Sequence, residues 1–352
     1  MWRTIHVFYY ASDKDQLLLT IECIMGSLRE RVPSLEYYVR RHWKRGPHIR
    51  LNYRVSDSDY QRVTSRLFDT LKAFVEEHPS VEQLDEKQLE PLHRHLARLE
   101  RETGPLFPLM KDNSVVVAEY DDRRKHLQGA DATEVMARAW ISMTPYVVNV
   151  IKVSKADYDL RIRIALQMML VLAQPEKASG YRNTLTFRSH LEGFLRTVND
   201  PDGLIDAFNK RAERLELLKE PFCGYTPDIT SVADDWGVVL HGWFDLFKKY
   251  VAERGLQPNA APLPVADASA FHRALYSNPK FVEYITSPEF ETVRLVVNFM
   301  YLTYIQMGLK PIDKYFLCWT ICQMLEPAGG WGSVLETWAK DEEMRNETAA
   351  QE

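Results

Sequence analysis

The order of hydrophobic periodicities near the N-terminus constrains the fold of this chain more than any other feature. Alternation with period two predicts strands, and apolar residues at three- and four-residue spacing predict helices. The patterns follow one another as a strand at 2–10, a helix at 14–31, strands at 35–43 and 48–55, and a helix that begins after Ser56. The tight basic turn Lys44-Arg45-Gly46-Pro47 joins the two adjacent strands. This order predicts a ferredoxin-like β-α-β-β-α portion with an antiparallel hairpin in its sheet.

The chain becomes helical toward its C-terminal end. A charged helix at 83–102 and a strand at 114–120 precede this region. Further helices are predicted at 131–152, 157–173, 188–198, 202–218, 231–254, 267–276, 289–307 and 311–325. We therefore predict an α+β fold with a sheet portion at 1–130 and a frayed tail at 341–352. The helical portion at 131–340 packs on the sheet portion, either as a second domain or as part of one integrated domain.

Composition excludes several classes of protein. With 45% hydrophobic and 26% charged residues in 352, the chain can bury a core and is neither disordered nor fibrous. A formal net charge of −5 offers no global basic field, which disfavours a nucleic-acid partner. A strand pattern follows Met1 where a signal peptide would have an apolar core, and no apolar stretch reaches membrane-spanning length. We therefore expect a cytoplasmic protein with no membrane partner; its four scattered cysteines favour reduced thiols.

The densest polar constellation lies in the predicted hairpin. Alternation places Arg40 on one face of the first strand, and it places His48, Arg50 and Asn52 together on one face of the second strand. Guanidinium groups held on rigid strands suit bidentate capture of a carboxylate, and a neighbouring imidazole can move a proton near neutral pH. A solvated edge hairpin is an equally good interpretation of these residues alone.

Two further segments carry candidate residues. In the first, Thr186 is a predicted N-cap, Arg188 and Glu192 stand at helical i,i+4 spacing, and His190 lies between them. Such a pair is commonly structural, and a histidine there can simply bond within a core. In the second, a run of charge from Glu119 to His126 follows the last strand, where a solvated loop is the favoured interpretation.

Motifs for several chemistries are missing from the sequence. The histidine spacings match no recognised metal-ligand pattern, and neither a phosphate-binding glycine loop nor a nucleophile elbow occurs. We therefore predict no metal site and no cofactor.

A resemblance to a known family rests on four segments. These are the opening WRTIHVFYY, the hairpin YYVRRHWKRGPHIRLNY, the middle segment AEYDDRRKHLQG and the late helices NFMYLTYIQMGLKPIDKYFLC. Together they resemble the C-terminal domain of lantibiotic dehydratases, which also occurs as stand-alone thiopeptide-type bacteriocin biosynthesis proteins. The resemblance implies one of two activities on a modified precursor peptide. One is elimination of glutamate from glutamylated Ser or Thr, and the other is a formal [4+2] cyclisation of two dehydroalanines with loss of water and of the leader peptide.

The chain departs from the elimination motifs of that family at three places. The second arginine of the family's HIRLR is Asn52 here, and Arg123 and His126 stand where the family has a glutamate and an arginine. Tyr301 occupies the position of the family's late histidine. Because a carboxylate clamp and a histidine base are both altered, the departures favour a pyridine-synthase-like reaction over elimination.

We therefore predict a tailoring enzyme, a cofactor-independent lyase or cyclase, in the maturation of a ribosomally synthesised peptide. The predicted catalytic residues are Tyr301, His190 and His126, and the predicted substrate-binding residues are Arg40, His48, Arg50, Asn52, Arg123 and Arg188. Its partners would be the leader and core of a precursor peptide and a dehydratase protein, and dimerisation is left open. The two alternatives are glutamate elimination with a relocated base and a non-catalytic leader-peptide-binding subunit.

Overall fold

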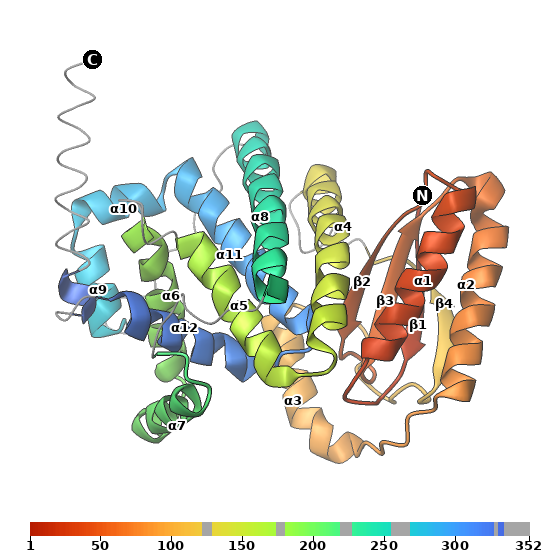
Figure 1. Cartoon of the computed structure of the whole chain (residues 1–352), viewed down its shortest axis with the longest axis horizontal. Coiled ribbons are helices and arrows are strands. Elements are labelled where there is room, and N and C mark those ends of the chain that lie inside the picture. The colour runs from red at the N-terminus through yellow and green to blue at the C-terminus, as the bar shows by residue number, and fades with distance from the viewer. Residues whose placement is uncertain (122–128, 174–179, 219–226, 255–267, 327–329, 334–352) are drawn as a thin grey trace. The chain divides into compact units, whose positions relative to one another are not determined.

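The computed structural model describes residues 1–121, 129–173, 180–218, 227–254, 268–326 and 330–333 and has the predicted α+β architecture (Figure 1). Its strands are β1 (Trp2–Phe8), β2 (Glu36–His42), β3 (His48–Arg54) and β4 (Ser114–Ala118). Its helices are α1 (Asp15–Arg31), α2 (Asp57–Glu77), α3 (Glu86–Leu99), α4 (Gly129–Ser154), α5 (Tyr158–Ala173), α6 (Gly180–Leu195), α7 (Pro201–Arg214), α8 (Pro227–Arg254), α9 (Ala270–Tyr276), α10 (Pro279–Ile285), α11 (Pro288–Gln306) and α12 (Pro311–Leu325). Among the described residues, no helix is long and apolar enough to cross a membrane.

The sheet completes the ferredoxin-like topology that the opening pattern predicts. Its strand order is β2-β3-β1-β4, and all three pairings are antiparallel. The register pairs Val39 with Leu51 and Ile5 with Leu51, so these side chains share one face. The other face carries Arg40, Arg50 and His6, because Arg50 pairs with both of its neighbours.

Helices α1 and α2 lie side by side over the apolar face of this sheet (Figure 1). Each presents one buried stripe at helical spacing, with Leu17, Ile21 and Leu28 in α1 and Leu67 and Leu71 in α2. Each such side chain contributes roughly 1.5–3 kcal/mol through the area that it removes from water. Ser56 caps α2, because its side-chain oxygen accepts a hydrogen bond from the backbone N–H of Asp59.

The chain divides into two compact units. The first comprises Met1–Lys152 and Gln306–Gly308, and the second comprises Val153–Ile305 and Leu309–Glu352. The boundary at 130 that the sequence suggests stays a prediction.

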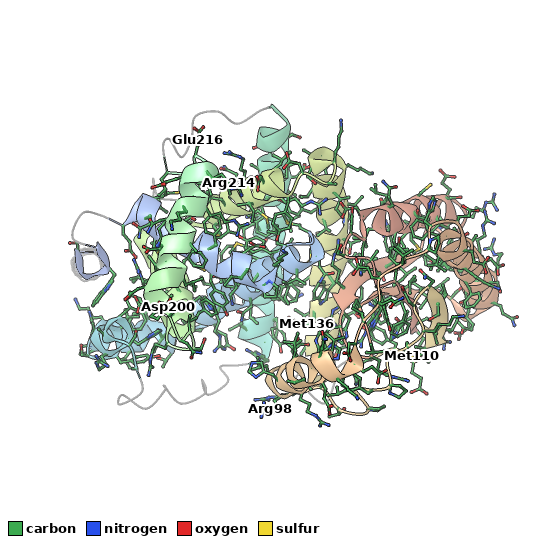
Figure 2. All side chains as sticks on the ribbon, turned by 90° about the horizontal axis from the view of Figure 1, so that it is seen from below. Arg98, Met110, Met136, Asp200, Arg214 and Glu216 are labelled. Carbon is green, nitrogen blue, oxygen red and sulfur yellow. The ribbon has the colours of Figure 1, made fainter. Side chains whose placement is uncertain are left out.

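The second unit is helical, and α5 lies at its centre with side chains buried on every face. Helix α5 contacts α6, α8 and α12, and α12 also contacts α7. The termini of α7 are fixed by Asp200, which accepts a hydrogen bond from Gly203 N at 2.9 Å, and by Arg214, whose guanidinium lies 2.8 Å from Asp159 at the start of α5; Figure 2 labels Asp200 and Arg214.

One predicted helical boundary is wrong, and one helix was not predicted. Helix α6 begins at Gly180, so Thr186 lies inside the helix and is not its N-cap. The sequence patterns also miss α10, a seven-residue helix that begins at Pro279 and is capped by Asn278. The periodicity is weak in both places, because α6 begins with the polar run Gly180-Tyr181-Arg182-Asn183 and α10 is only seven residues long.

Candidate functional site

The polar face of the sheet, hereafter the histidine–arginine face, gathers three histidines around Arg50. His48 lies in the same strand as Arg50, His42 pairs with His48 across β2, and His6 pairs with Arg50 across β1. The ring centroid of His48 lies 4.9 Å from that of His6 and 5.3 Å from that of His42. The structure therefore brings together the predicted Arg40, His48, Arg50 and Asn52 and adds His6 and His42 to them.

Hydrogen bonds fix the protonation of two of these imidazoles. His48 donates through Nδ1 to the carbonyl oxygen of Gly46 at 2.8 Å, and its Nε2 accepts from Nε of Arg50 at 3.2 Å. His42 accepts through Nδ1 from the backbone N–H of Lys44 at 3.1 Å and from the Arg50 guanidinium at 3.3 Å. Both rings are consequently neutral, with one nitrogen each committed to holding Arg50.

Burial and the nearby guanidinium keep these rings neutral over a wide pH range. Desolvation, followed by the charge of Arg50, lowers the pKa of His6 to about 3. Desolvation is also the main cause that lowers the pKa of His42 to about 3 and the pKa of His48 well below its usual value. Because both of its ring nitrogens are occupied, by Gly46 and by Arg50, His48 is a positioning residue for Arg50.

Both arginines of this face have neighbours that hold their guanidinium groups. Arg50 lies 3.9 Å from Asp121, whose side chain is half exposed, and the guanidinium of Arg40 lies 4.8 Å from the centroid of the Trp140 ring. Asn52 is buried, and its side-chain amide approaches the carbonyl oxygen of Arg50 at 3.5 Å. Two guanidinium groups beside neutral imidazoles can bind a carboxylate or peptide carbonyls.

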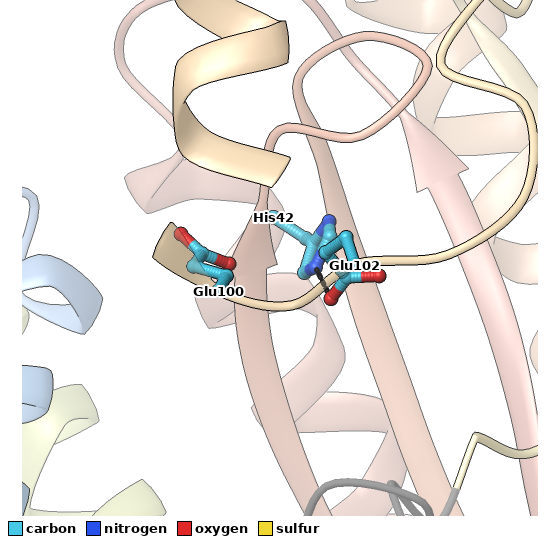
Figure 3. A group of neighbouring side chains, drawn as sticks. All are labelled: His42, Glu100 and Glu102. Atoms are coloured by element: carbon cyan, nitrogen blue, oxygen red, sulfur yellow. Dashed lines mark ion pairs between the residues drawn. The ribbon is translucent and has the colours of Figure 1, made fainter. Parts of the chain in front are cut away.

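His42, Glu100 and Glu102 form a group with metal-ligating side chains at the edge of this face (Figure 3). Their ligand atoms lie within 4.8 Å of one another, and Nε2 of His42 is 3.5 Å from Oε1 of Glu102. A metal needs the lone pair of Nε2, but the two donors on Nδ1 place the imidazole proton on Nε2. Lys44 Nζ lies 3.4 Å from Glu102, and Trp43 donates to Glu100 at 3.1 Å. The group therefore fits a set of polar contacts around the Lys44–Glu102 ion pair and does not fit a metal centre.

A second polar constellation lines a cavity in the helical unit, hereafter the α6–α11 cavity. It has a volume of about 540 Å³ and is bounded by α6, α9, α10 and α11. Leu275, Phe281 and Ile285 belong to the apolar cluster that walls it. Polar groups reach it from Ser189, His190, His272, Arg294 and Asn298. A largely apolar hollow of this size with a few convergent polar groups is the usual form of a small-molecule or peptide side-chain site.

His272 forms a hydrogen-bonded chain at the wall of the α6–α11 cavity. Its Nε2 lies 2.9 Å from Oγ of Ser189, and its Nδ1 lies 2.8 Å from Oγ of Ser269. Burial, followed by the charge of Arg196, lowers the pKa of His272. A neutral imidazole between two hydroxyls can pass a proton through Ser189 to a group in the cavity. Sequence reasoning missed this chain, because Ser189 and His272 are far apart in sequence and only the fold brings them together.

The predicted residues His190 and Tyr301 also meet in the helical unit. Their ring centroids lie 4.9 Å apart in an edge-to-face arrangement, and His190 lines the cavity. Burial, with a smaller effect of Lys314, lowers the pKa of His190 to about 4. Tyr301 is buried, its hydroxyl lies 3.4 Å from the sulfur of Cys318, and its pKa is raised by burial. Tyr301 therefore supports the His190 ring, and its hydroxyl is directed to α12.

The remaining predicted residues have other positions. Arg188 donates through Nε to Glu326 at 2.8 Å and lies 3.5 Å from Glu192, so the predicted i,i+4 pair forms as part of an ion-pair cluster. Hydrogen bonding to Glu326 raises the pKa of Arg188 despite burial. Its substrate-binding role stays a prediction. His126 and Arg123 lie outside the described residues.

Comparison with known proteins agrees with this architecture. The structure is similar to one described as the pyridine synthase TbtD from thiomuracin biosynthesis, with a TM-score of 0.69 at 21% identity, over 91% of this chain and 96% of that one. It is also similar to TsrL, with a TM-score of 0.59 at 19% identity, over 91% of this chain and 93% of that one. The tRNA-dependent lantibiotic dehydratase MibB from Microbispora sp. 107891 has a TM-score of 0.47 at 10% identity, over 92% of this chain and 28% of that one.

A search among curated proteins found no match. The family model described as lantibiotic biosynthesis dehydratase C-term matches residues 2–325, which is nearly the whole chain. The resemblance that the hairpin and the late helices suggest is thereby confirmed. The chain belongs to the lantibiotic biosynthesis dehydratase C-terminal family.

Proposed function

We propose that the protein is a tailoring enzyme that matures a ribosomally synthesised peptide by joining two dehydroamino acids in a pyridine-synthase-like cyclisation. The observation that carries this proposal is the α6–α11 cavity, an apolar hollow whose lining includes two neutral imidazoles, His190 and His272. Likeness to a pyridine synthase over 96% of that chain gives further support. The proposed site of action is the cytoplasm, and the proposed substrate is a dehydrated precursor peptide.

The proposed reaction requires orientation and proton transfer. The walls around Phe281 and Leu275 would hold the two alkenes together and exclude water, so that much of the acceleration comes from positioning. A cyclisation with loss of water and of the leader moves protons between amide nitrogen and oxygen atoms. His190 and the Ser189–His272 pair are neutral at pH 7 and can accept these protons and return them without a cofactor.

The histidine–arginine face would contribute to binding. Arg40 and Arg50 offer guanidinium donors held by Trp140 and by two imidazoles, which suits peptide carbonyls or a carboxylate. Glutamate elimination is the second candidate function, and this cationic face is the observation that favours it, because a glutamyl carboxylate would bind there. Elimination also needs a base near the same substrate, and two of the three imidazoles of this face are occupied in holding Arg50.

Mass spectrometry of the cognate precursor peptide separates these functions. The fully dehydrated peptide and the glutamylated peptide are each incubated with the purified protein. Loss of one water together with the leader from the dehydrated peptide is expected and supports cyclisation. Release of glutamate from the glutamylated peptide would instead establish elimination, and binding without any mass change would indicate a leader-binding subunit.

Variants in the cavity test its assignment. His272→Gln and Ser189→Ala should each lower the turnover of the dehydrated peptide by roughly 10²-fold, the usual contribution of a positioned acid or base. His241→Gln is the matched control, because its side chain is 82% exposed on α8. Unchanged turnover in both cavity variants would remove the α6–α11 cavity from the mechanism.

A further inference from the structure

A groove between α1 and α2, hereafter the α1–α2 groove, lies on the side of the sheet opposite to the histidine–arginine face. It has a volume of about 720 Å³. Its walls carry the guanidinium groups of Arg31, Arg62 and Arg66 and the hydroxyls of Thr20, Ser27 and Thr70, and its floor includes Ile24 and Leu28. The proposed cyclisation makes no use of this groove.

The fold itself concentrates the three arginines at one end of the groove. Strand β2 begins where β3 ends, since Glu36 pairs with Arg54, and this brings the end of α1 close to the start of α2. Arg31 occupies the last turn of α1, and Arg62 and Arg66 share one face of α2 at i,i+4 spacing. All three side chains are exposed.

The charge around the groove is unbalanced. Among the described residues, no carboxylate belongs to its lining, although Arg62 lies 2.5 Å from Asp59 in the preceding turn. Like charges around one hollow repel each other, and an anion in the hollow would relieve this cost. The contrast is marked in a chain whose formal net charge is −5.

We propose that the α1–α2 groove binds an acidic segment of the precursor's leader peptide. This inference rests on the proposed function, which supplies a peptide substrate and names its leader as the partner. Guanidinium groups bind carboxylates bidentately, and the floor formed by Ile24 and Leu28 accepts apolar side chains between the acids. A nucleic acid fits less well, because the lining has no aromatic side chain on which a base can stack. The leader would thus be held on the other side of the sheet from Arg40 and Arg50.

Binding is measured by fluorescence anisotropy on the full-length protein. One probe is the fluorescein-labelled leader of the cognate precursor, and the second is the same leader with its Asp and Glu replaced by Asn and Gln. R62Q/R66Q should raise the Kd of the first probe by about tenfold or more, because it removes two charged contacts. R94Q/R98Q removes the same charge from exposed positions on α3 outside the groove and should change the Kd less than about twofold.

Cys23 reports where the peptide lies. It is exposed and lines the groove, whereas the other described cysteines, Cys318 and Cys322, are buried. Saturating leader should slow alkylation of Cys23 by iodoacetamide, measured by peptide mapping, and should do so in R94Q/R98Q as well. Cys23→Ala is the control for this measurement, because the alkylated peptide assigned to Cys23 must be absent from the peptide map of this variant.

Three outcomes would overturn the docking proposal. The first is that R62Q/R66Q and the unaltered protein bind the acidic leader with equal affinity. The second is that the acidic and neutralised leaders bind with equal affinity. The third is that the bound leader leaves the rate of Cys23 alkylation unchanged. Groove-dependent binding of a labelled RNA without leader binding would assign the groove to another ligand. If the leader binds as expected but the dehydrated precursor stays uncyclised, the proposed function fails and the docking site stands.

Discussion

At the scale of single residues, two desolvated histidines make the stability of the protein sensitive to acid. Burial lowers the pKa of His6 and His42 to about 3, whereas the same groups titrate near 6.5 in an unfolded chain. Between these pH values the unfolded chain binds more protons than the folded one. The free energy of unfolding should therefore fall as the pH falls from about 6.5 toward 3, by up to about 1.4 kcal/mol per pH unit for each such group.

His6→Gln tests this linkage. Urea unfolding followed by circular dichroism at pH 7 and pH 5 gives the loss of stability between the two conditions. The variant should lose about 2 kcal/mol less than the unaltered protein, since one largely desolvated imidazole no longer differs in its pKa between the two states. His241→Gln, at an exposed position, should leave the loss unchanged. An equal loss in the unaltered protein and His6→Gln would refute the linkage.

His190 and Tyr301 should differ in their effect on turnover. His190 lines the α6–α11 cavity, whereas the hydroxyl of Tyr301 is directed to Cys318. His190→Gln should lower kcat by roughly 10²-fold, and Tyr301→Phe, which keeps the ring edge against His190, should lower it much less. Single-turnover rates measured with the dehydrated precursor decide this. If Tyr301→Phe lowers kcat more than His190→Gln does, the hydroxyl of Tyr301 is the group that transfers the proton.

At the scale of elements, Asp313 joins three helices of the helical unit. Its carboxylate accepts from the backbone N–H of Lys310 at 2.7 Å and from Arg211 in α7 at 2.6 Å, and it also contacts the hydroxyl of Tyr158 at the start of α5. Asp313→Ala leaves these donors without a buried acceptor and should lower the free energy of unfolding by about 3 kcal/mol. Thermal unfolding measures the loss. Asp159→Ala breaks an exposed pair with Arg214 and should cost no more than about 1 kcal/mol, so equal losses would contradict this role.

The elements differ in how well their sequences predict them. The sheet and its helices were predictable, because each strand and helix buries one face and therefore shows a clear period of two or of about 3.6 residues in its sequence. The hairpin fixes Arg40 and Arg50 on one face for the same reason. Helix α10 was missed, because Asn278 and Pro279 start a segment too short to display a period. The α6–α11 cavity was beyond sequence reasoning, since it combines side chains from α6, α9, α10 and α11 that only tertiary packing brings together.

At the scale of the whole molecule, the proposed leader-binding and cyclisation residues belong to different compact units. The α1–α2 groove lies within Met1–Lys152, and the α6–α11 cavity lies within Val153–Ile305. The two linings have no residue in common. Because sites without shared partners usually act independently, binding and chemistry should respond separately to substitution.

Combining the two sets of variants measures this independence. R62Q/R66Q should raise KM for the dehydrated precursor and leave kcat unchanged, whereas His190→Gln should lower kcat and leave the leader Kd unchanged. In the combined variant the losses in kcat/KM should add within about 0.5 kcal/mol. A larger coupling energy would mean that leader binding changes the state of the cavity, so that the leader activates the enzyme as well as holding the substrate. Steady-state kinetics of the four proteins distinguishes these cases, because activation would make kcat itself depend on Arg62 and Arg66 at saturating peptide.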